Sequence, residues 1–375
     1  MTKIPLSAPD VTEAEIEAVS AVLRTPRLSL GPKLEEFEEA MARYIGTSHA
    51  IATNSGTSGL HLCIRALGIA EGDEVIVPSF AFIAVANALR YERATPVFVD
   101  IDPYTLNLDP CKIEEAITPR TRAIIVVHTF GVPAALPEIL ETARRHQLFV
   151  IEDACEAIGA EYDSRKVGSF GDAGVFGFYP NKQITAGEGG MIVTNNPTIA
   201  TLAKKLRNQG RCTTGEWLEH DEQGYNYRIS EVNCALGIEQ LKRIAPILER
   251  REVIAREYQR RLENHADVEL PPIALPRCRI SWFVYVIRCC GESAPSRRDE
   301  VFKEMVARGI ACGRYFAPIH LQPAYRTQLH RSMDLTHTEL IARRTLALPF
   351  FNRITNEQIE EVCQTLQEVL RTIHA

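Results

Sequence analysis

The chain has 375 residues, of which 45% are hydrophobic, so it can bury a sizeable core and has the length of about two domains. Its net charge of −6 argues against nucleic acid as a partner. We find no signal-peptide pattern and no apolar run of roughly 18 residues, and expect a protein that is neither exported nor membrane-spanning. The ten cysteines form no C-x-x-C pair, which favours reduced thiols in a cytoplasm over disulfides or a zinc site.

The first thirty or so residues predict an arm that carries one helix. Thr12 and Glu15 form a Thr-x-x-Glu start signal, and apolar residues follow at helical spacing up to Leu23. A break at residues 30–32 precedes a second amphipathic helix, which is expected to run from Leu34 to Gly46.

Apolar runs then alternate with helical patterns up to Asp153. The expected strands are 49–53, 74–78, 96–100, 123–128 and 148–153, and the expected helices are 60–67, 83–89 and 135–146. Val- and Ile-rich runs that are separated by helices are typical of a parallel sheet with both faces covered. The fold class predicted for this part of the chain is therefore α/β.

The pattern changes after about residue 240. A long helix is expected to end near residue 264, prolines cluster at 265–280, and a strand at 281–288 precedes helices at 299–308 and 356–373. We therefore expect a large domain with its N-terminal arm over residues 1–245 and a smaller α+β C-terminal domain over residues 246–375.

Lys182 is the first candidate for chemistry. It lies between an aromatic run that contains Pro180 and a glycine-rich turn at 187–190, where the backbone can approach a ligand closely. A lysine can form a Schiff base with an aldehyde once its surroundings deprotonate it. Taken alone, however, a lysine at this place is more often a surface residue before a hairpin turn.

Three features of the predicted large domain favour the interpretation of Lys182 as a catalytic lysine. The turn Ser55-Gly56-Thr57-Ser58 joins a strand to a helix, so its amides can bind an anion or simply begin a helix. Asp153 ends a strand at the edge where open α/β sheets bind ligands; it can keep a pyridine nitrogen protonated or cap a following helix. Phe82 can stack on a flat cofactor or belong to the core. Together with Lys182, these features predict a pyridoxal 5'-phosphate site.

At this point the sequence resembles the DegT/DnrJ/EryC1/StrS family of pyridoxal phosphate-dependent sugar aminotransferases over nearly the whole chain. The segments that carry the resemblance are 54–58, 77–83, 96–102, 150–154, the Lys182 block with 187–191, and 224–231. The resemblance implies fold type I, with a mostly parallel sheet sandwiched by helices in the large domain and a smaller α+β domain at the C-terminus. It also implies a homodimer with shared active sites.

The resemblance further implies roles for the candidate residues. Lys182 corresponds to the lysine that binds the cofactor's aldehyde and moves the proton, and Asp153 to the partner of the pyridine nitrogen. Phe82 corresponds to the aromatic residue that stacks on the ring. The phosphate cradle corresponds to the amides of Gly56, Thr57 and Ser58.

Other implied contacts lie later in the chain. Asn226 is similar to the residue that reaches the phosphate from the other subunit, and His320 to a residue at the substrate mouth. Tyr315 belongs to a predicted substrate-binding loop. Arg228 and Arg314 are the arginines that we expect to meet anionic groups, with pairing to a surface carboxylate as the alternative.

Two residues depart from the family pattern. Glu156 stands where many members have Gln or His near the ring's 3-oxygen, which a carboxylate would repel unless it is protonated or turned away. We assign it to the cofactor site on position alone. Gly177 stands where many members carry a phosphate-binding serine, so one hydroxyl donor is missing.

The function predicted is the conversion of a keto group of a nucleotide-linked sugar to an amine, with glutamate as donor and 2-oxoglutarate as its product, in amino-sugar biosynthesis for a surface polysaccharide or a glycosylated metabolite. Lys182 argues against the family's dehydratase branch, which has a histidine there. An aminocyclitol or other keto-substrate aminotransferase stays open. A non-catalytic regulator would have no reason to keep Lys182, Asp153 and the phosphate turn together.

Overall fold

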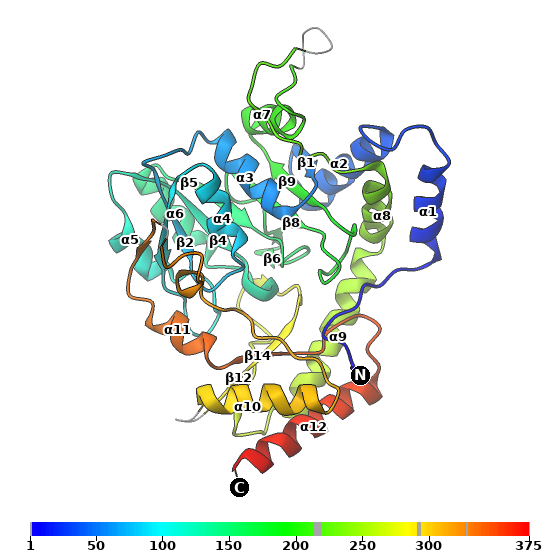
Figure 1. Cartoon of the computed structure of the whole chain (residues 1–375), viewed down its shortest axis with the longest axis vertical. Helices are drawn as coiled ribbons and strands as arrows, with labels where there is room; N and C mark the ends of the chain where they lie inside the picture. The colour runs from blue at the N-terminus through cyan, green and yellow to red at the C-terminus, as the bar shows by residue number, and fades with distance from the viewer. Residues whose placement is uncertain (1, 213–218, 291–293, 328, 375) are drawn as a thin grey trace.

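A large central sheet organises the first two thirds of the chain in the computed structural model, which describes residues 2–212, 219–290, 294–327 and 329–374 (Figure 1). The sheet has eight strands. In spatial order they are β1 (His49–Thr53), β9 (Gly190–Thr194), β8 (Ala173–Gly177), β5 (Phe149–Asp153), β4 (Thr121–Val127), β2 (Glu74–Pro78), β3 (Thr95–Val99) and β13 (Arg331–Ser332). All neighbours from β8 to β13 pair in parallel, whereas β9 is antiparallel to both β1 and β8.

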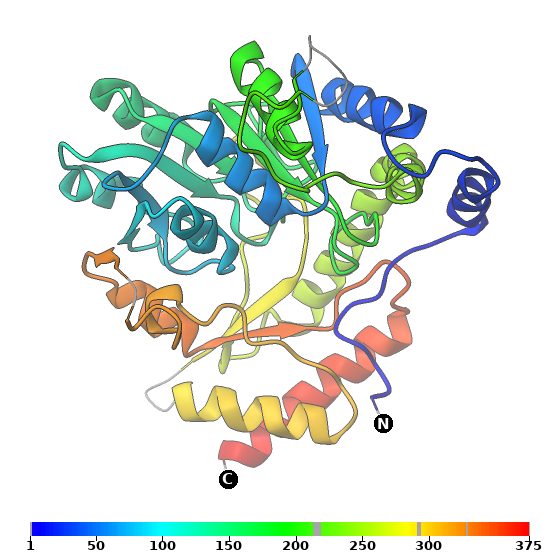
Figure 2. The same ribbon diagram turned by 45° about the horizontal axis from the view of Figure 1, so that its top comes forward.

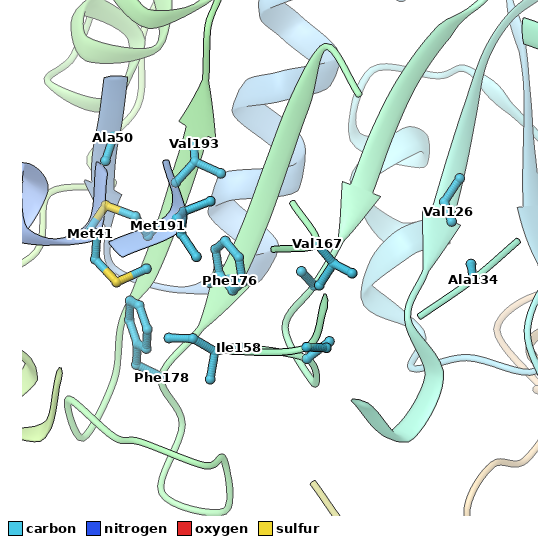
Figure 3. Close-up of a cluster of buried hydrophobic side chains, with 14 of the residues drawn as sticks. Met41, Ala50, Val126, Ala134, Ile158, Val167, Phe176, Phe178, Met191 and Val193 are labelled. Carbon is cyan, nitrogen blue, oxygen red and sulfur yellow. The ribbon is translucent and has the colours of Figure 1, made fainter. Parts of the chain in front are cut away.

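The strands bury both faces because alternate side chains enter two separate cores. In β4, Ile124 and Val126 belong to one buried cluster, and Ile125 and Val127 to the other. Figure 3 shows side chains of the first cluster, including Met41 of a covering helix and Val126 of β4. This two-faced burial explains the nearly continuous apolar strands of the sequence, and it confirms the predicted α/β class.

Helices cover both faces of the sheet (Figures 1 and 2). The first cluster contains side chains from α2 (Pro32–Ile45), α5 (Ile113–Ala116), α6 (Leu136–His146) and α8 (Glu231–Lys242). The second contains side chains from α3 (Gly56–Ala66), α4 (Ala84–Tyr91) and α7 (Pro197–Arg207).

The C-terminal third forms a core of its own at the opposite end of the molecule, where both termini lie (Figure 1). Its sheet consists of β10 (Val268–Glu269), β12 (Tyr285–Cys289) and β14 (Thr345–Leu348). Its helices are α9 (Ile244–Leu262), α10 (Ala294–Ala307) and α12 (Asn356–His374), and α11 (Thr336–Ala342) lies between β13 and β14. A small sheet of β6 (Glu161–Tyr162), β7 (Arg165–Lys166) and β11 (Cys278–Arg279) joins the two parts of the sequence.

The proposed domain boundary at residue 245 remains a prediction, and two elements bear on it. Helix α9 contributes Ile247 to the first cluster and Tyr258 to the C-terminal core, so it continues from one part into the other. Strand β13, from the C-terminal part, pairs with β3 at the edge of the large sheet.

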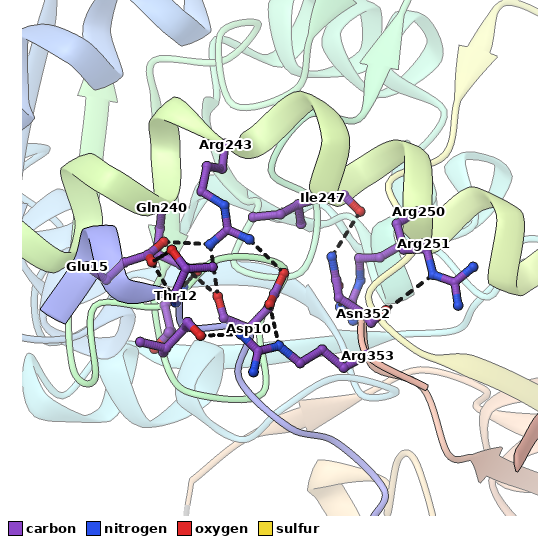
Figure 4. Close-up of polar contacts among 12 residues, drawn as sticks. Asp10, Thr12, Glu15, Gln240, Arg243, Ile247, Arg250, Arg251, Asn352 and Arg353 are labelled. Atoms are coloured by element: carbon purple, nitrogen blue, oxygen red, sulfur yellow. Dashed lines mark hydrogen bonds and ion pairs between the residues drawn. The ribbon is translucent and has the colours of Figure 1, made fainter. Parts of the chain in front are cut away.

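The N-terminal arm contains α1 (Glu13–Leu23) and is tied to α8 and α9 by buried polar contacts (Figure 4). Glu15 accepts hydrogen bonds from Gln240 Nε2 at 2.8 Å and from Arg243 Nη1 at 2.7 Å. Burial alone would raise the pKa of Glu15, but the hydrogen bonds from Thr12, Gln240 and Arg243 outweigh it and lower that pKa to about 2. The arm therefore has a fixed position beside the sheet.

The structure corrects several local expectations. No helix follows Asp153, and α3 starts at Gly56 rather than Leu60. The long helix expected up to residue 264 is interrupted at Arg243. Strand β8 was not expected, because its Ala-Gly-Val-Phe-Gly sequence is short and rich in glycine, which weakens the strand signal. In the part of the chain that the structure describes, no helix has the length and apolar character needed to cross a membrane.

Candidate active site

A cavity of about 460 Å³ opens among the carboxyl ends of the central strands and the C-terminal part of the chain. Ligands of open α/β sheets bind at this edge, because loops there carry polar groups and helix N-termini point toward it. Seven of the residues that were assigned a site role from the sequence line the cavity: Gly56, Thr57, Phe82, Asp153, Glu156, Lys182 and Tyr315.

The β1–α3 turn supplies an anion-binding wall of the cavity. Ser55 is the N-cap of α3, and its Oγ accepts a hydrogen bond from Ser58 N at 3.1 Å. The amides of the first turn of α3 have no partner within the helix and lie at its positive end. A Cβ at Gly56 would lie 2.7 Å from Cys155 Sγ, so only glycine leaves the turn this close to the next strand end.

Asp153 is buried at the last position of β5. Its Oδ1 accepts a hydrogen bond from Cys155 N at 3.1 Å within a tight turn, so the carboxylate is fixed although no helix follows. Cys155 also lines the cavity. Gly177, on β8, faces this thiol, and a Cβ there would lie 3.3 Å from Cys155 Sγ, so glycine at this position accommodates the bulkier neighbour.

Lys182 is held between an aromatic ring and a carboxylate. Its Nζ lies 4.1 Å from the centre of the Phe283 ring and 3.5 Å from Glu156 Oε1, and its side chain is 15% exposed. The next residue, Gln183, donates from Nε2 to the carbonyl oxygens of Glu156 at 2.6 Å and Ser281 at 3.0 Å. Because Gln183 is anchored on both sides, the lysine points into the cavity from a rigid base.

Glu156 contacts Lys182 and the backbone at the same time. Its Oε2 accepts a hydrogen bond from Phe130 N at 3.0 Å. Burial raises the pKa of the Glu156 carboxyl, and the charge of Lys182 only partly offsets that effect. A carboxyl that takes up a proton here could donate a hydrogen bond to an oxygen anion instead of repelling it.

Aromatic side chains form the remaining walls. Phe82 is 61% exposed, which is unusual for a core phenylalanine and suits a ring that stacks on a ligand. Tyr315 and Phe316 lie opposite, next to Phe283. Asn181 also lines the cavity, and its Oδ1 atom is buried without a hydrogen-bond partner among the described residues.

Sequence reasoning missed three of these residues, Asn181, Phe283 and Phe316. Asn181 directly precedes Lys182, and this position next to the candidate lysine could have identified it as a site residue. Phe283 and Phe316 come from the C-terminal part of the chain, more than a hundred residues after Lys182, and no local pattern distinguishes them from core phenylalanines.

The other predicted site residues lie outside this cavity. Ser58 borders a neighbouring hollow, and Asn226 is exposed on the segment that follows α7. Arg228 donates to Asn208 Oδ1 at 3.1 Å. His320 is largely enclosed between Ser79 Oγ at 2.7 Å and Glu339 Oε1 at 3.3 Å. These four residues do not line the cavity around Lys182, and their roles stay predictions.

Arg314 likewise lies outside the cavity lining. Its Nη2 is 3.2 Å from Asp299 Oδ1, and its guanidinium lies over the Phe302 ring at 4.3 Å. This matches the alternative that it pairs with a surface carboxylate.

A mixed α/β fold with a lysine, an acidic strand end and a helix N-terminus around one cavity defines a class of protein that binds an anionic cofactor at its sheet edge. A family model described as the DegT/DnrJ/EryC1/StrS aminotransferase family matches residues 9–367. The chain belongs to this aminotransferase family, which confirms the resemblance and the prediction of an enzyme.

Known proteins agree with this assignment over their full lengths. The chain is 42% identical to GDP-perosamine synthase of Caulobacter vibrioides, over 99% of each chain. It is 35% identical to DesV of S. venezuelae, solved in complex with a ketimine intermediate, with a TM-score of 0.90 and 99% of each chain covered. The sugar aminotransferase Spr1654 of Streptococcus pneumoniae, described as putative and solved in its PMP form, has 25% identity and a TM-score of 0.94, over 99% of this chain and 100% of its own.

Proposed function

We propose that the chain is a pyridoxal phosphate-dependent aminotransferase that replaces a keto group of a nucleotide-linked sugar by an amine. The observation that carries the proposal is the arrangement of Lys182, Asp153 and the N-terminus of α3 around one cavity. Family membership supports the reaction type, and the relative named for GDP-perosamine supports a nucleotide-linked sugar as acceptor.

The residues present fit the cofactor. The amides of Gly56 and Thr57 at the start of α3 would hold its phosphate, and Asp153 would pair with the ring nitrogen. Phe82 and Cys155 line the same cavity and would contact the ring. The absence of a Cβ at Gly56 leaves the backbone free to approach the phosphate. When bound, pyridoxal phosphate supplies an aldehyde for amino groups and an electron-withdrawing ring.

Lys182 is the residue proposed to carry protons at the reacting carbon of the substrate. The Phe283 ring and the Glu156 carboxyl restrict where Nζ can move, so the amine stays close to its working position. Because Glu156 also contacts Phe130 N, it can give or take a proton at Lys182 without leaving its place.

The proposed amino donor is glutamate, and the proposed acceptor carries a guanosine diphosphate group, as in the product name of the Caulobacter relative. Tyr315 and Asn181 are polar residues that line the cavity, and they are proposed to contact the sugar. Arg228 is proposed for the anionic diphosphate, although it pairs with Asn208 in the free subunit.

The experiment that tests this function follows the nitrogen atom. Purified protein with pyridoxal phosphate and isotope-labelled glutamate is incubated with nucleotide-linked keto-sugars, and the products are analysed by mass spectrometry. Label is expected in an amino sugar that still carries its nucleotide. Label that appears only in other amino acids, or nowhere, would contradict the proposal.

We further propose that the site is shared across a homodimer, with Asn226 of the partner subunit at the phosphate. Asn226 is exposed and outside the cavity of its own subunit, as expected of a residue that acts across an interface. Chains with Lys182→Ala and chains with Asn226→Asp are each expected to be nearly inactive. After the two are mixed and subunits exchange, each mixed dimer has one intact site, so about a quarter of wild-type activity should return.

The control for this complementation is each variant mixed with itself under the same conditions. If mixed dimers form, as seen by native mass spectrometry, and activity stays absent, Asn226 acts within its own subunit or not at the site.

A further inference from the structure

The segment around Asn226 has alternating side chains that differ sharply in their surroundings. Tyr225 and Tyr227 stack on each other with ring centres 5.0 Å apart and planes at 12°, whereas Asn226 between them is exposed. Backbone contacts fix the segment: Tyr227 N donates to Arg207 O at 3.0 Å, and Asn54 N donates to Tyr227 O at 2.9 Å. The geometry is that of a strand-like stretch in which Tyr225 and Tyr227 are half-buried and Asn226 between them is exposed.

Both tyrosine hydroxyls contact one hydrogen-bonded pair, the buried His61 and the half-buried Glu92. Tyr227 Oη is 3.0 Å from His61 Nδ1, and Tyr225 Oη donates to Glu92 Oε1 at 3.0 Å. His61 Nε2 and Glu92 Oε1 are 2.7 Å apart, and His61 is 3% exposed. We call these four residues the His61 network.

The protonation state of His61 decides which groups of the His61 network donate hydrogen bonds and which accept them. Burial lowers the pKa of His61 below its usual value, more than Glu92 raises it, so the neutral ring prevails at neutral pH. A neutral ring bonded to a carboxylate at Nε2 donates there and accepts at Nδ1. Tyr227 therefore donates to His61, and His61 donates to Glu92. Each polar side chain of the His61 network thus has a hydrogen-bond partner.

The same helix carries the phosphate turn and the His61 network. His61 lies one helical turn after Thr57 on α3, so the two face the same side. Ser55, Thr57 and Ser58 line a hollow of about 510 Å³ together with His61, Tyr225 and Tyr227, and this hollow shares Ser55 and Thr57 with the main cavity. The segment that presents Asn226 is thus fastened to the helix whose N-terminus forms the anion site.

We propose that His61, Glu92, Tyr225 and Tyr227 are positioning residues that present Asn226 to the phosphate of the cofactor in the neighbouring subunit. None of these four residues lines the cavity around Lys182; the network acts by fixing the backbone on both sides of Asn226. This inference rests on the proposed function, because it needs pyridoxal phosphate as the ligand and Asn226 as its contact.

The test compares the affinities of the full-length protein for pyridoxal phosphate and for pyridoxal, which lacks the phosphate. Tyr225→Phe and Tyr227→Phe remove only the hydroxyls and keep the stacked rings. Asn226→Ala is expected to weaken binding of pyridoxal phosphate about tenfold, and the double Tyr→Phe variant about fivefold, with pyridoxal binding changed less than about twofold. In the Asn226→Ala background the two Tyr→Phe changes should add less than about twofold.

A matched control is Tyr325→Phe, which removes another hydroxyl that is bonded to α4, at 2.9 Å from Asn87 Oδ1, and should leave both affinities unchanged. The inference is overturned if the Tyr→Phe variants have no effect, if they weaken pyridoxal equally, or if they act as strongly without Asn226. If Asn226→Ala itself leaves the affinity unchanged, the phosphate contact is wrong and the inference fails with it, while the nitrogen-transfer experiment still decides the proposed reaction.

Discussion

Replacing Lys182 by alanine is expected to reduce turnover by on the order of a thousandfold or more, while pyridoxal phosphate still binds. The reaction loses the amine that moves protons in the cavity, whereas the amides at the start of α3 and Asp153 remain to hold the cofactor. The measurement combines steady-state rates with an absorbance spectrum, in which the band of lysine-bound cofactor should disappear.

Lys166→Ala is the matched control for this variant. Lys166 also lies next to a carboxylate, with its Nζ 3.5 Å from Glu161 Oε1, and next to an aromatic ring, that of Tyr44, but it is outside the cavity. It should retain wild-type activity and the wild-type spectrum. Unchanged turnover of Lys182→Ala would remove Lys182 from the mechanism.

The second large effect is expected for Asp153→Asn, with activity reduced on the order of a hundredfold and the fold intact. The amide oxygen of asparagine can still accept the hydrogen bond from Cys155 N, so the turn should survive. What is lost is the negative charge that the ring nitrogen requires to stay protonated. Steady-state rates and thermal unfolding, measured on the same preparation, distinguish the loss of this charge from a loss of the fold.

Asp172→Asn makes a suitable comparison, because Asp172 also accepts a backbone hydrogen bond, from Val150 N at 2.8 Å, at the opposite end of β5. Its activity should stay within about threefold of wild type. A similarly small loss for Asp153→Asn would reduce that carboxylate to a structural role.

The parallel part of the sheet was predictable because its strands are buried on both faces. The run at residues 74–78 is apolar after its first residue, Glu74, and its bounds agree with β2 to the residue. Strand β8 escaped prediction because it contains two glycines. One of them, Gly177, stands where Cys155 leaves little room for a side chain, a constraint that only the folded chain shows.

The candidate site was predictable where residues follow strand ends. Gly56 and Asp153 each follow a predicted strand, so topology alone brings them together. Lys182 follows β8, which was not predicted, and was found from its aromatic and glycine-rich flanks instead. The aromatic walls could not be found in this way. Phe283 reaches Lys182 from the C-terminal part of the chain, where Arg251 holds its carbonyl oxygen at 2.8 Å, a contact with no local sequence signal.

The central claim is that a nucleotide-linked keto-sugar is the substrate. The reaction of the enzyme-bound amino form of the cofactor with such a sugar tests this claim most directly. The protein is first converted to this form with glutamate, and its return to the aldehyde form is followed by stopped-flow absorbance. A nucleotide-linked keto-sugar is expected to drive this return far faster than pyruvate or oxaloacetate, with only 2-oxoglutarate comparable among the oxoacids. Rapid reaction with pyruvate or oxaloacetate, together with inert keto-sugars, would contradict the account and indicate a general amino-acid aminotransferase.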